Sequence, residues 1–530
     1  MNNQPISLLH HKAAVCASPQ ASSASFIDDQ HFIASLFNLN VHDIQELHTS
    51  KDTKSGDTFI YIKLLPSFPS CPHCGDFSPR IKDYYPRRIN HSVLSNTHTT
   101  LIYKDRRYLC PHCNKTFYTK SPFTENGFKH SLLTTQHILE DLKDPNKTMA
   151  SIAKRYDLSP TTIAHVFDAH VHIGRRKLPS FLSVDEVYAF KSKQSKYVCV
   201  LLDYKNKVPV DILPSRKYDD LARFFSSISK EELESVKVFS TDMWETYRKI
   251  ATNYLPNASI ICDHFHVIQE CNKRLDHIRI NIQKSFSTKD DAYYLLKKFN
   301  WVLFKNDMHL LDPNRHKRYN KRMKRYLNYH DIKCLLQDSH PELEVAINLK
   351  DALCMFYDTI KIIEPDQDPE YKEIVPPVRY KPDGKPTKRS IKLHDEARKR
   401  NEKRILTEQE ALCELEELIG RFRNCPLIEF SNFASTLHKW KHEIINSLKV
   451  YSELDNRAVS NALIENRNKI IKNVKHTSNG YANWNRFRNR LMYTLTPDAT
   501  YSLNADPEVM ERKRLRNQQY YQKWKLNNEK

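Results

Sequence analysis

Glycine is scarce in this sequence, and its scarcity excludes one large class of function. Only 7 of the 530 residues are glycine, and neither GxGxxG nor GxxxxGK[ST] occurs. Both motifs need glycine because the backbone must approach phosphate groups closely. The sequence therefore predicts no nucleotide cofactor and argues against an ATP-driven machine.

Long apolar runs are missing as well. No stretch of eighteen or more apolar residues occurs, which predicts that no helix spans a membrane. Residues 1–30 carry an Ala/Ser-rich run without a basic start and a long apolar core, so we expect a disordered lead-in rather than a signal peptide. Eight of the twelve cysteines are scattered, which is typical of free thiols in a reducing compartment.

Positive charge, by contrast, is in surplus. The chain has 83 Lys and Arg against 63 Asp and Glu, a formal net charge of +20. Such a surplus favours a polyanionic partner, although a merely soluble basic protein would have the same composition. At about 150 residues per domain, the length predicts about three or four domains.

One tetrapeptide occurs twice in the N-terminal part. Cys-Pro-His-Cys stands at Cys71–Cys74 and again at Cys110–Cys113. Two CxxC turns supply the tetrahedral cage of sulfurs that Zn²⁺ prefers, and four cysteines leave no open position for catalysis. A β-hairpin would fill the 35 residues between the pairs. The alternatives are a disulfide pair or a redox CxxC, and the free cysteines elsewhere argue against them.

Basic residues surround the cysteines, and a helix-turn-helix pattern follows at 148–167. Arg106 and Arg107 belong to a cluster that suits phosphate contacts. In the helical pattern Ser159 is a natural N-cap, and Pro160 follows it at N1. The second helix would present three polar side chains to a major groove, although an ordinary helical hairpin has the same pattern. These side chains are Thr161, Thr162 and His165.

From residue 181 the pattern becomes rich in strands. We expect three strands in succession, then a helix, a strand, a helix and a strand, which is the order β-β-β-α-β-α-β. The expected strands are 181–190, 197–203, 208–213, 236–241 and 259–262. Asp185 lies near the middle of the first strand, and Asp242 follows the fourth.

These two acids would meet if the first and fourth strands are neighbours. Close carboxylates repel each other unless a divalent cation lies between them, which is the setting of two-metal phosphoryl transfer. Asp242 alone could be a helix N-cap, whereas Asp185 in an apolar strand needs a partner. Glu465 stands on an amphipathic helix at 460–474, and by itself it reads as a surface acid.

Four stretches together resemble one known family. LSVDEV around Asp185, STDMWETY around Asp242, CDHFHV at 262–267 and NALIENRNKIIK around Glu465 resemble the DDE transposases of bacterial insertion sequences of the IS-L-three type. The cysteine pairs and the helix-turn-helix before them match the same family. The resemblance covers roughly residues 60–495. Ala462 and Asn466 stand where the family leads us to expect glycine.

The resemblance implies a multidomain α+β protein. Its zinc ribbon and helix-turn-helix precede an RNase H-like α/β catalytic domain that a helical insertion interrupts. It implies that Asp185, Asp242 and Glu465 are the catalytic acids and bind Mg²⁺ or Mn²⁺, with His266 as an accessory residue. It also implies a bacterial, cytoplasmic, nucleoid-associated homo-oligomer on double-stranded DNA, which cleaves at terminal inverted repeats and transfers strands to target DNA.

We therefore expect seven segments. They are the lead-in 1–30, the zinc ribbon 31–125, the helix-turn-helix domain 126–178, the catalytic domain in two parts 179–270 and 456–500, the helical insertion 271–455, and a basic C-terminal tail 501–530. In the insertion, the basic run 315–325 suits either DNA contact or a solvated helix face.

Two other functions fit parts of this pattern. A non-enzymatic zinc and helix-turn-helix regulator would need no carboxylate pair. An RNase H-like nuclease for RNA–DNA hybrids would show no preference for end sequences. Metal-dependent nicking of terminal-repeat DNA separates a transposase from the regulator, whereas equal cleavage of RNA–DNA hybrids would favour the nuclease.

Overall fold

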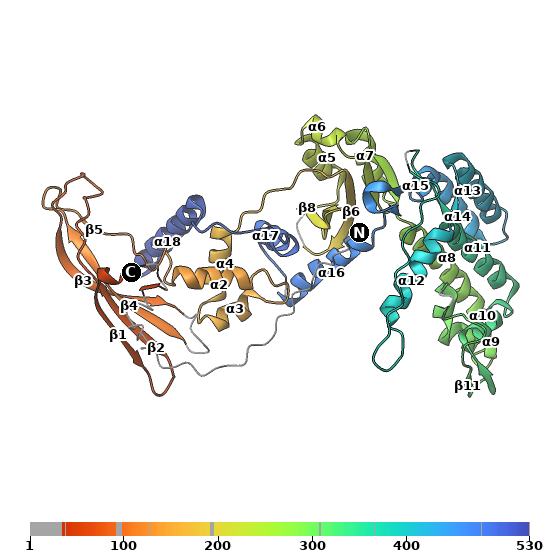
Figure 1. Ribbon diagram of the computed structural model, residues 1–530, viewed down its shortest axis with the longest axis horizontal. Coiled ribbons are helices and arrows are strands. Elements are labelled where there is room, and N and C mark those ends of the chain that lie inside the picture. Colours follow the sequence, from red (N-terminus) through yellow and green to blue (C-terminus); the bar gives the residue numbers. More distant parts are fainter. Residues whose placement is uncertain are drawn as a thin grey trace, which may run out of the picture. The chain divides into compact units, whose positions relative to one another are not determined.

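The computed structural model describes residues 34–35, 37, 39–91, 98–125, 127–190, 195–306, 309–365, 367–478 and 480–528. The chain forms two compact units (Figure 1). Unit 1 combines residues 1–141, 150–170 and 503–530, and unit 2 combines residues 142–149 and 171–502. The expected lead-in lies outside the described residues. No helix among the described residues is long and apolar enough to cross a membrane.

Unit 1 begins with a mixed sheet. Its strands, after the short 3-10 turn η1 (Val41–Asp43), are β1 (Ile44–Lys51), β2 (Thr58–Leu64), β3 (Arg80–Asn90), β4 (Thr99–Leu109) and β5 (Thr116–Tyr118). They lie in the order β1-β2-β4-β3, with β5 on β4. The antiparallel β3–β4 pair is the hairpin expected between the two cysteine pairs. Alternate residues of β2, Ile60 and Ile62, fill the core together with the cross-strand pair Ile89 and Leu101, as a half-buried sheet requires.

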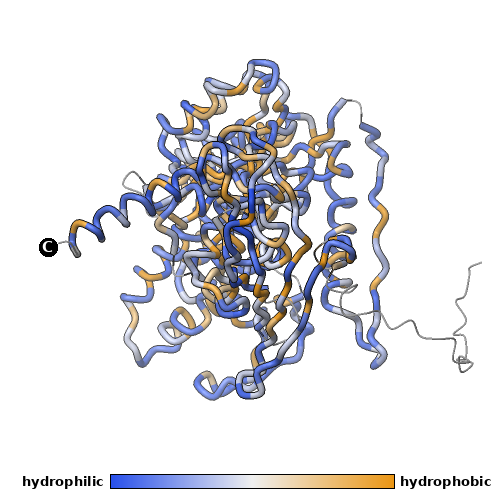
Figure 2. The backbone as a smooth tube through the Cα atoms, turned by 90° about the vertical axis from the view of Figure 1, so that its left-hand side faces the viewer, coloured by the Kyte–Doolittle hydropathy of each residue, from blue (hydrophilic) through white to orange (hydrophobic). Residues whose placement is uncertain are grey.

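The helices of unit 1 are α2 (Leu132–Asp141), α3 (Met149–Arg155, which begins in unit 2), α4 (Pro160–His170) and α18 (Pro507–Asn528). The expected N-cap of α4 is confirmed, because Ser159 Oγ accepts a hydrogen bond from Thr162 N at 3.1 Å. Asp157 makes the preceding turn with φ at 51°. The expected basic tail contains α18, whose tube is mostly blue, and therefore hydrophilic, in Figure 2.

Unit 2 contains the second five-stranded sheet. Its strands are β6 (Phe181–Tyr188), β7 (Tyr197–Asp203), β8 (Val208–Leu213), β9 (Val238–Thr241) and β10 (Ser259–Cys262). The order is β10-β9-β6-β7-β8. β6, β7 and β8 are antiparallel, whereas β9 runs parallel to both β6 and β10. The first and fourth strands of the expected series are therefore neighbours, as the pairing of the two aspartates requires.

Helices bury both faces of this sheet. They are α5 (Tyr218–Ser226), α6 (Lys230–Glu234), α7 (Glu245–Tyr254), α16 (Ala462–Thr477) and α17 (Trp484–Leu495). Strand β7 alternates between two cores: Leu201 packs with Phe225 and Ile250, and Val200 packs with Ile464. Helix α16 lies far after β6 in the sequence, since Asn468 and Asp185 are 283 residues apart, yet it packs against β6 (Figure 1).

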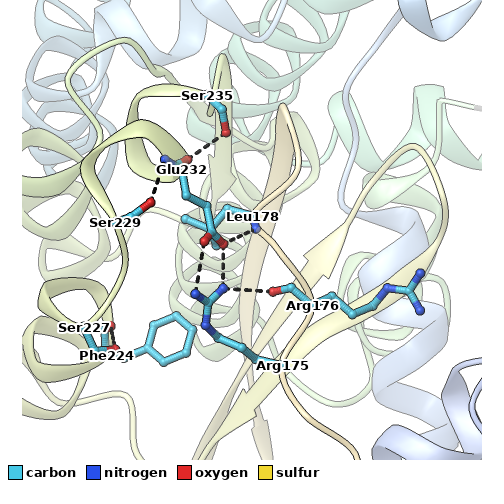
Figure 3. Close-up of polar contacts among 8 residues, drawn as sticks. All are labelled: Arg175, Arg176, Leu178, Phe224, Ser227, Ser229, Glu232 and Ser235. Atoms are coloured by element: carbon cyan, nitrogen blue, oxygen red, sulfur yellow. Dashed lines mark hydrogen bonds and ion pairs between the residues drawn. The ribbon is translucent and has the colours of Figure 1, made fainter.

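An ion pair anchors the segment that leads into β6. The Arg175 guanidinium donates to both oxygens of Glu232 on α6, at 2.5 and 3.1 Å, and Leu178 N donates to the same carboxylate at 2.7 Å (Figure 3). Arg175 lowers the pKa of Glu232 through this hydrogen bond. The clamp fixes the residues just before β6, and with them the start of the strand that carries Asp185.

Helices dominate the residues between β10 and α16. The elements are α8 (His264–Ser285), α9 (Asp291–Lys298), η2 (Asn300–Phe304), β11 (Arg318–Asn320), β12 (Arg325–Leu327), α10 (Tyr329–Gln337), α11 (Pro341–Thr359), β13 (Ile360–Lys361), α12 (Lys388–Glu402), β14 (Arg404–Ile405), α13 (Glu408–Arg423), α14 (Ile428–Lys439), α15 (Lys441–Asn446), β15 (Val450–Tyr451), η3 (Ser452–Leu454) and β16 (Arg457–Ala458). They share one apolar core, which includes Leu275, Leu353 and Phe430.

The basic run at 315–325 was expected either to contact DNA or to form a solvated helix face, and the structure differs from the second expectation. The run contains no helix: β11 and β12 pair as an antiparallel hairpin. The helix-face interpretation of this run was therefore wrong. Cross-strand pairing of Tyr319 with Tyr326 supplies the aromatic contact that a strand favours.

Candidate functional site

Three carboxylates meet at one edge of the unit 2 sheet. Register pairs Ser183 with Ser240 on the parallel strands β6 and β9; Asp185 comes two residues after Ser183 within β6, and Asp242 directly follows the end of β9. Oxygens of Asp185, Asp242 and Glu186 all lie within 4.8 Å of one another. The structure thus brings together the two aspartates that the strand pattern paired, and it adds Glu186.

The electrostatics of this edge disfavour bare negative charge. Burial, together with the charge of Asp242, raises the pKa of Asp185 to about 7. Burial and the charge of Glu186 raise the pKa of Asp242 to about 6. A divalent cation between the carboxylates would offset both causes. Asp and Glu oxygens are also the ligands that Mg²⁺ and Mn²⁺ prefer, so the residues fit such an ion.

Helix α16 is attached to this edge by two asparagines. Asn468 Nδ2 donates to Asp185 Oδ2 at 2.7 Å, and both side chains are buried. Asn461 Oδ1 accepts from Ser240 Oγ at 2.8 Å, and Asn461 N donates to Asp263 Oδ1 at 3.0 Å. These contacts fix the helix against the ends of β6, β9 and β10.

Glu465 lies on α16 between the two asparagines. Positions 461, 465 and 468 are four and three residues apart, so they share one face of the helix. Glu465 is half-buried, and among the residues that the structure describes its carboxylate makes no hydrogen bond and no ion pair. It is not among the three carboxylates whose oxygens lie within 4.8 Å of one another. Glu465 therefore shares a helix face with two asparagines that contact the site, but its carboxylate is not part of the cluster.

Glu186 was missed by the sequence reasoning. Adjacent residues of a strand point to opposite faces, so Glu186 did not look like a partner of Asp185. Its carboxylate pairs with Arg216 and accepts a hydrogen bond from Tyr247 Oη at 3.3 Å. Arg216 in turn lies between two aromatic rings, 4.4 Å from the centroid of Tyr197 and 4.4 Å from that of Trp244. No spacing signal links these residues in the sequence.

His266 lies at the same edge, on the first turn of α8. Its Nδ1 is 3.3 Å from Asp263 Oδ2. Burial alone would lower the pKa of His266, but the contact with Asp263 and the charges of Asp185 and Asp242 raise it. His266 in turn lowers the pKa of both Asp185 and Asp242 through its charge.

The four cysteines of unit 1 form a second candidate metal centre. Their sulfurs lie within 4.8 Å of one another, with Cys71–Cys113 at 3.7 Å and Cys74–Cys110 at 3.5 Å. A tetrahedral zinc ion with Zn–S bonds of about 2.3 Å places its sulfurs about 3.8 Å apart. The sulfur positions therefore fit Zn²⁺.

Both CxxC turns have the same backbone geometry. Gly75 N donates to Cys71 O, and Asn114 N donates to Cys110 O, each at 2.9 Å. Gly75 and Asn114 both have positive φ, 76° and 54°, which glycine and asparagine tolerate best. This repeated turn is what directs all four thiols to one point.

The five residues expected to contact DNA have different surroundings. Arg106 is buried, and its guanidinium donates to Leu64 O. The Arg107 guanidinium pairs with Asp83. On α4, Thr161 is exposed, whereas Thr162 and His165 are half-buried. A phosphate contact by Arg106 would require its side chain to leave the sheet interior.

Comparison with known proteins identifies the class. Residues 182–368 and 383–491, more than half of the chain, match the model of the ISL3-type DDE transposases. Residues 67–113 match the zinc-finger of transposase IS204/IS1001/IS1096/IS1165. The transposase for insertion sequence element IS1001 of Bordetella parapertussis is 20% identical over 252 residues, which cover 47% of this chain and 61% of that protein. The chain belongs to the ISL3 family of insertion-sequence DDE transposases.

Proposed function

We propose that the chain binds the terminal inverted repeats of an insertion sequence and catalyses metal-dependent DNA cleavage and strand transfer. The observation that carries the proposal is the approach of Asp185 and Asp242 from neighbouring strands, in a chain of this family. The raised pKa values of both aspartates support a metal site, because a bound cation would offset the burial and mutual repulsion that raise them.

We assign the third metal-binding carboxylate to Glu465. Its position between Asn461 and Asn468 supports the assignment, and so does its lack of hydrogen-bond or ion-pair partners among the described residues. Glu186 is the competing candidate because it is closer to the aspartates. Its oxygens, however, already accept from Arg216 and Tyr247, so its charge is largely balanced.

Two Mg²⁺ or Mn²⁺ ions held there would activate water and balance charge on the attacking and leaving oxygens of the scissile phosphate. Neighbouring residues of the chain position the carboxylates that would hold the ions. Asn468 fixes one oxygen of Asp185, and Glu186 N fixes the other by donating to it at 2.8 Å. His266 lies beside Asp263 and its pKa is raised by that contact and by the two aspartates, so the accessory role we assign to it is to offset their negative charge.

DNA binding is the role we assign to the zinc ribbon and to α4. The four-cysteine centre would hold structural zinc and fix the adjacent β3–β4 hairpin, which carries Arg107. Thr161, Thr162 and His165 would face the major groove if α4 is a recognition helix. We further propose that the protein works as a homo-oligomer on paired ends and target DNA.

The test uses a labelled duplex made from the DNA that flanks this reading frame. With Mn²⁺ or Mg²⁺ the wild-type chain should nick the duplex at the element's ends, and Asp185→Asn should bind it equally well without nicking. The matched control is Asp219→Asn, because Asp219 is an exposed acid outside the carboxylate cluster. Binding without any metal-dependent nicking by the wild type would instead identify a non-enzymatic regulator.

A further inference from the structure

A second strongly basic surface lies in the helical part of unit 2. Residues 315–326, RHKRYNKRMKRY, contain seven Lys and Arg and no acid. They form the β11–β12 hairpin, which Figure 1 places at the end of the helical part that lies away from strands β6 and β8. We call this segment the basic hairpin. It belongs to none of the carboxylate or cysteine clusters described above.

The hairpin is held rigidly on the helical core. Leu327 at its end is buried in that core, and Asn328 caps α10 while its Nδ2 donates to Pro313 O and Arg315 O. In the turn, Asn320 Oδ1 accepts from the backbone N–H groups of Arg322 and Met323, each at 3.1 Å. The positive charges therefore sit on a defined scaffold rather than on a loose tail.

Most of these charges are not balanced within the protein. Lys317 pairs with Asp331, and Arg322 pairs with Asp291. Five other cations form no ion pair with any residue that the structure describes, and all five are exposed; one of them is Arg315, whose guanidinium donates to His309 O at 3.0 Å. The other four are Arg318, Lys321, Lys324 and Arg325. Unpaired like charges on a rigid ribbon repel one another, and a polyanion would relieve that repulsion.

A cavity of about 640 Å³ opens beside the hairpin. Its cationic lining comes from both the hairpin and α9, and no acidic residue lines it. The cationic residues are Lys298, Arg315, Arg318, Lys321 and Arg322, and His316 lies among them. Aromatic rings lie among them: Lys298 Nζ is 5.3 Å from the ring centroid of Tyr294, and Tyr319 is half-exposed.

The chemistry that fits this surface is a phosphodiester backbone. Arg and Lys side chains bind phosphate oxygens, and interleaved aromatic rings are typical of nucleic-acid surfaces. A two-stranded β-ribbon also has the width that the major groove of duplex DNA admits. An acidic protein would also balance the positive charge of the hairpin, but the proposed function makes DNA the polyanion that this protein binds.

We propose that the basic hairpin and the cavity beside it form a duplex DNA-binding site separate from the carboxylate edge. The inference rests on the proposed function for the identity of the polyanion. The site binds the phosphate backbone of DNA that the protein already holds and does not read its sequence.

The experiment measures the salt dependence of DNA binding by the full-length chain. The probe is a fluorescein-labelled duplex of arbitrary sequence, in buffer without Mg²⁺ or Mn²⁺. The slope of log affinity against log salt falls by about 0.9 for each phosphate that a side chain no longer neutralises. The variant Arg318→Ala/Lys321→Ala/Arg325→Ala should therefore lower the slope by about 2.7. The single change Lys321→Ala, in the exposed turn, should lower it by about 0.9 and cannot unfold the hairpin core.

The control removes three exposed cations that already have an acidic neighbour on their own helix. These are Lys230 with Glu234, Lys273 with Glu270, and Arg398 with Glu402. Their triple alanine variant should keep the wild-type slope to within about 0.9, the effect of a single phosphate. Equal slopes for the wild type and both hairpin variants overturn the proposal. Nicking by Asp185→Asn would refute the carboxylate assignment but leave the hairpin result intact, so the two failures are distinguishable.

Discussion

Asn468→Ala is the substitution that probes the carboxylate edge most specifically. Asn468 is 6% exposed, and its Nδ2 lies 2.7 Å from Oδ2 of the buried Asp185. A hydrogen bond to a charged group contributes about 1.5 to 3 kcal/mol, and truncation leaves the carboxylate oxygen without that donor. We therefore expect unit 2 to lose about 2 kcal/mol of unfolding free energy.

Urea unfolding followed by tryptophan fluorescence measures this loss. Trp244, Trp301, Trp440 and Trp484 all belong to unit 2, and Trp524 is the fifth tryptophan. The signal therefore reports mainly on the unit that contains Asn468. The matched control is Asn466→Ala, because Asn466 is exposed on the same helix.

The same variant should be a poor nuclease. Asp185 loses the donor that orients it, so the Mn²⁺-dependent nicking rate should fall by about tenfold or more, which corresponds to about 1.4 kcal/mol of barrier. If Asn468→Ala matches Asn466→Ala both in unfolding free energy and in nicking rate, then α16 does not position Asp185 and the reasoning fails.

Three further predictions concern the metal centres and pH. Cys110→Ser should abolish zinc binding, measured as bound metal per chain, and should unfold the β3–β5 region in circular dichroism, since a structural zinc contributes on the order of 10 kcal/mol. Burial lowers the pKa of His91 and of His130 to about 4, below the unfolded value of about 6.5. The unfolded chain therefore binds more protons between these values, so unit 1 should keep its full stability above pH 6.5 and lose up to about 3 kcal/mol per histidine as the pH falls to 4; a flat unfolding midpoint from pH 7 to pH 4.5 would contradict this. Arg216→Ala removes the cation that faces Glu186, so the metal-free protein should melt at a lower temperature. Saturating Mg²⁺ should then raise the melting temperature of the variant by more than it raises that of the wild type. An equal rise in both proteins would show that Glu186 lies outside the reach of the ion.

Several features followed from the sequence because short-range rules determine them. Each CxxC turn is formed by residues adjacent in the sequence. Ser159 likewise caps α4 through a hydrogen bond from Thr162 N, three residues away. The pairing of Asp185 with Asp242 was predictable only in part. The apolar runs indicate the strands, and the two acids meet on the condition that the first and fourth strands are neighbours, which the pairing of β9 with β6 supplies.

Other features depend on tertiary contacts that spacing does not encode. Glu186 has a carboxylate oxygen within 4.8 Å of the two aspartates although it is the neighbour of Asp185 in the strand. Asn468 donates a hydrogen bond to Asp185 across 283 residues of sequence. Arg106 looked like a phosphate contact in a basic segment, yet its guanidinium bonds inside the sheet to Leu64 O. The basic run 315–325 carried no alternation strong enough to distinguish a hairpin from a helix, and the Tyr319–Tyr326 pairing is what the structure adds.

The assignment of the third carboxylate is the central claim, and one comparison tests it most directly. Glu465→Gln and Glu186→Gln are assayed side by side for Mn²⁺-dependent nicking of duplex DNA from the flanks of this reading frame. If Glu465 is the third metal ligand, Glu465→Gln nicks no DNA, whereas Glu186→Gln retains measurable nicking because Glu186 is balanced by Arg216 and Tyr247. Wild-type nicking by Glu465→Gln, with none by Glu186→Gln, would contradict the account and assign the third ligand to Glu186.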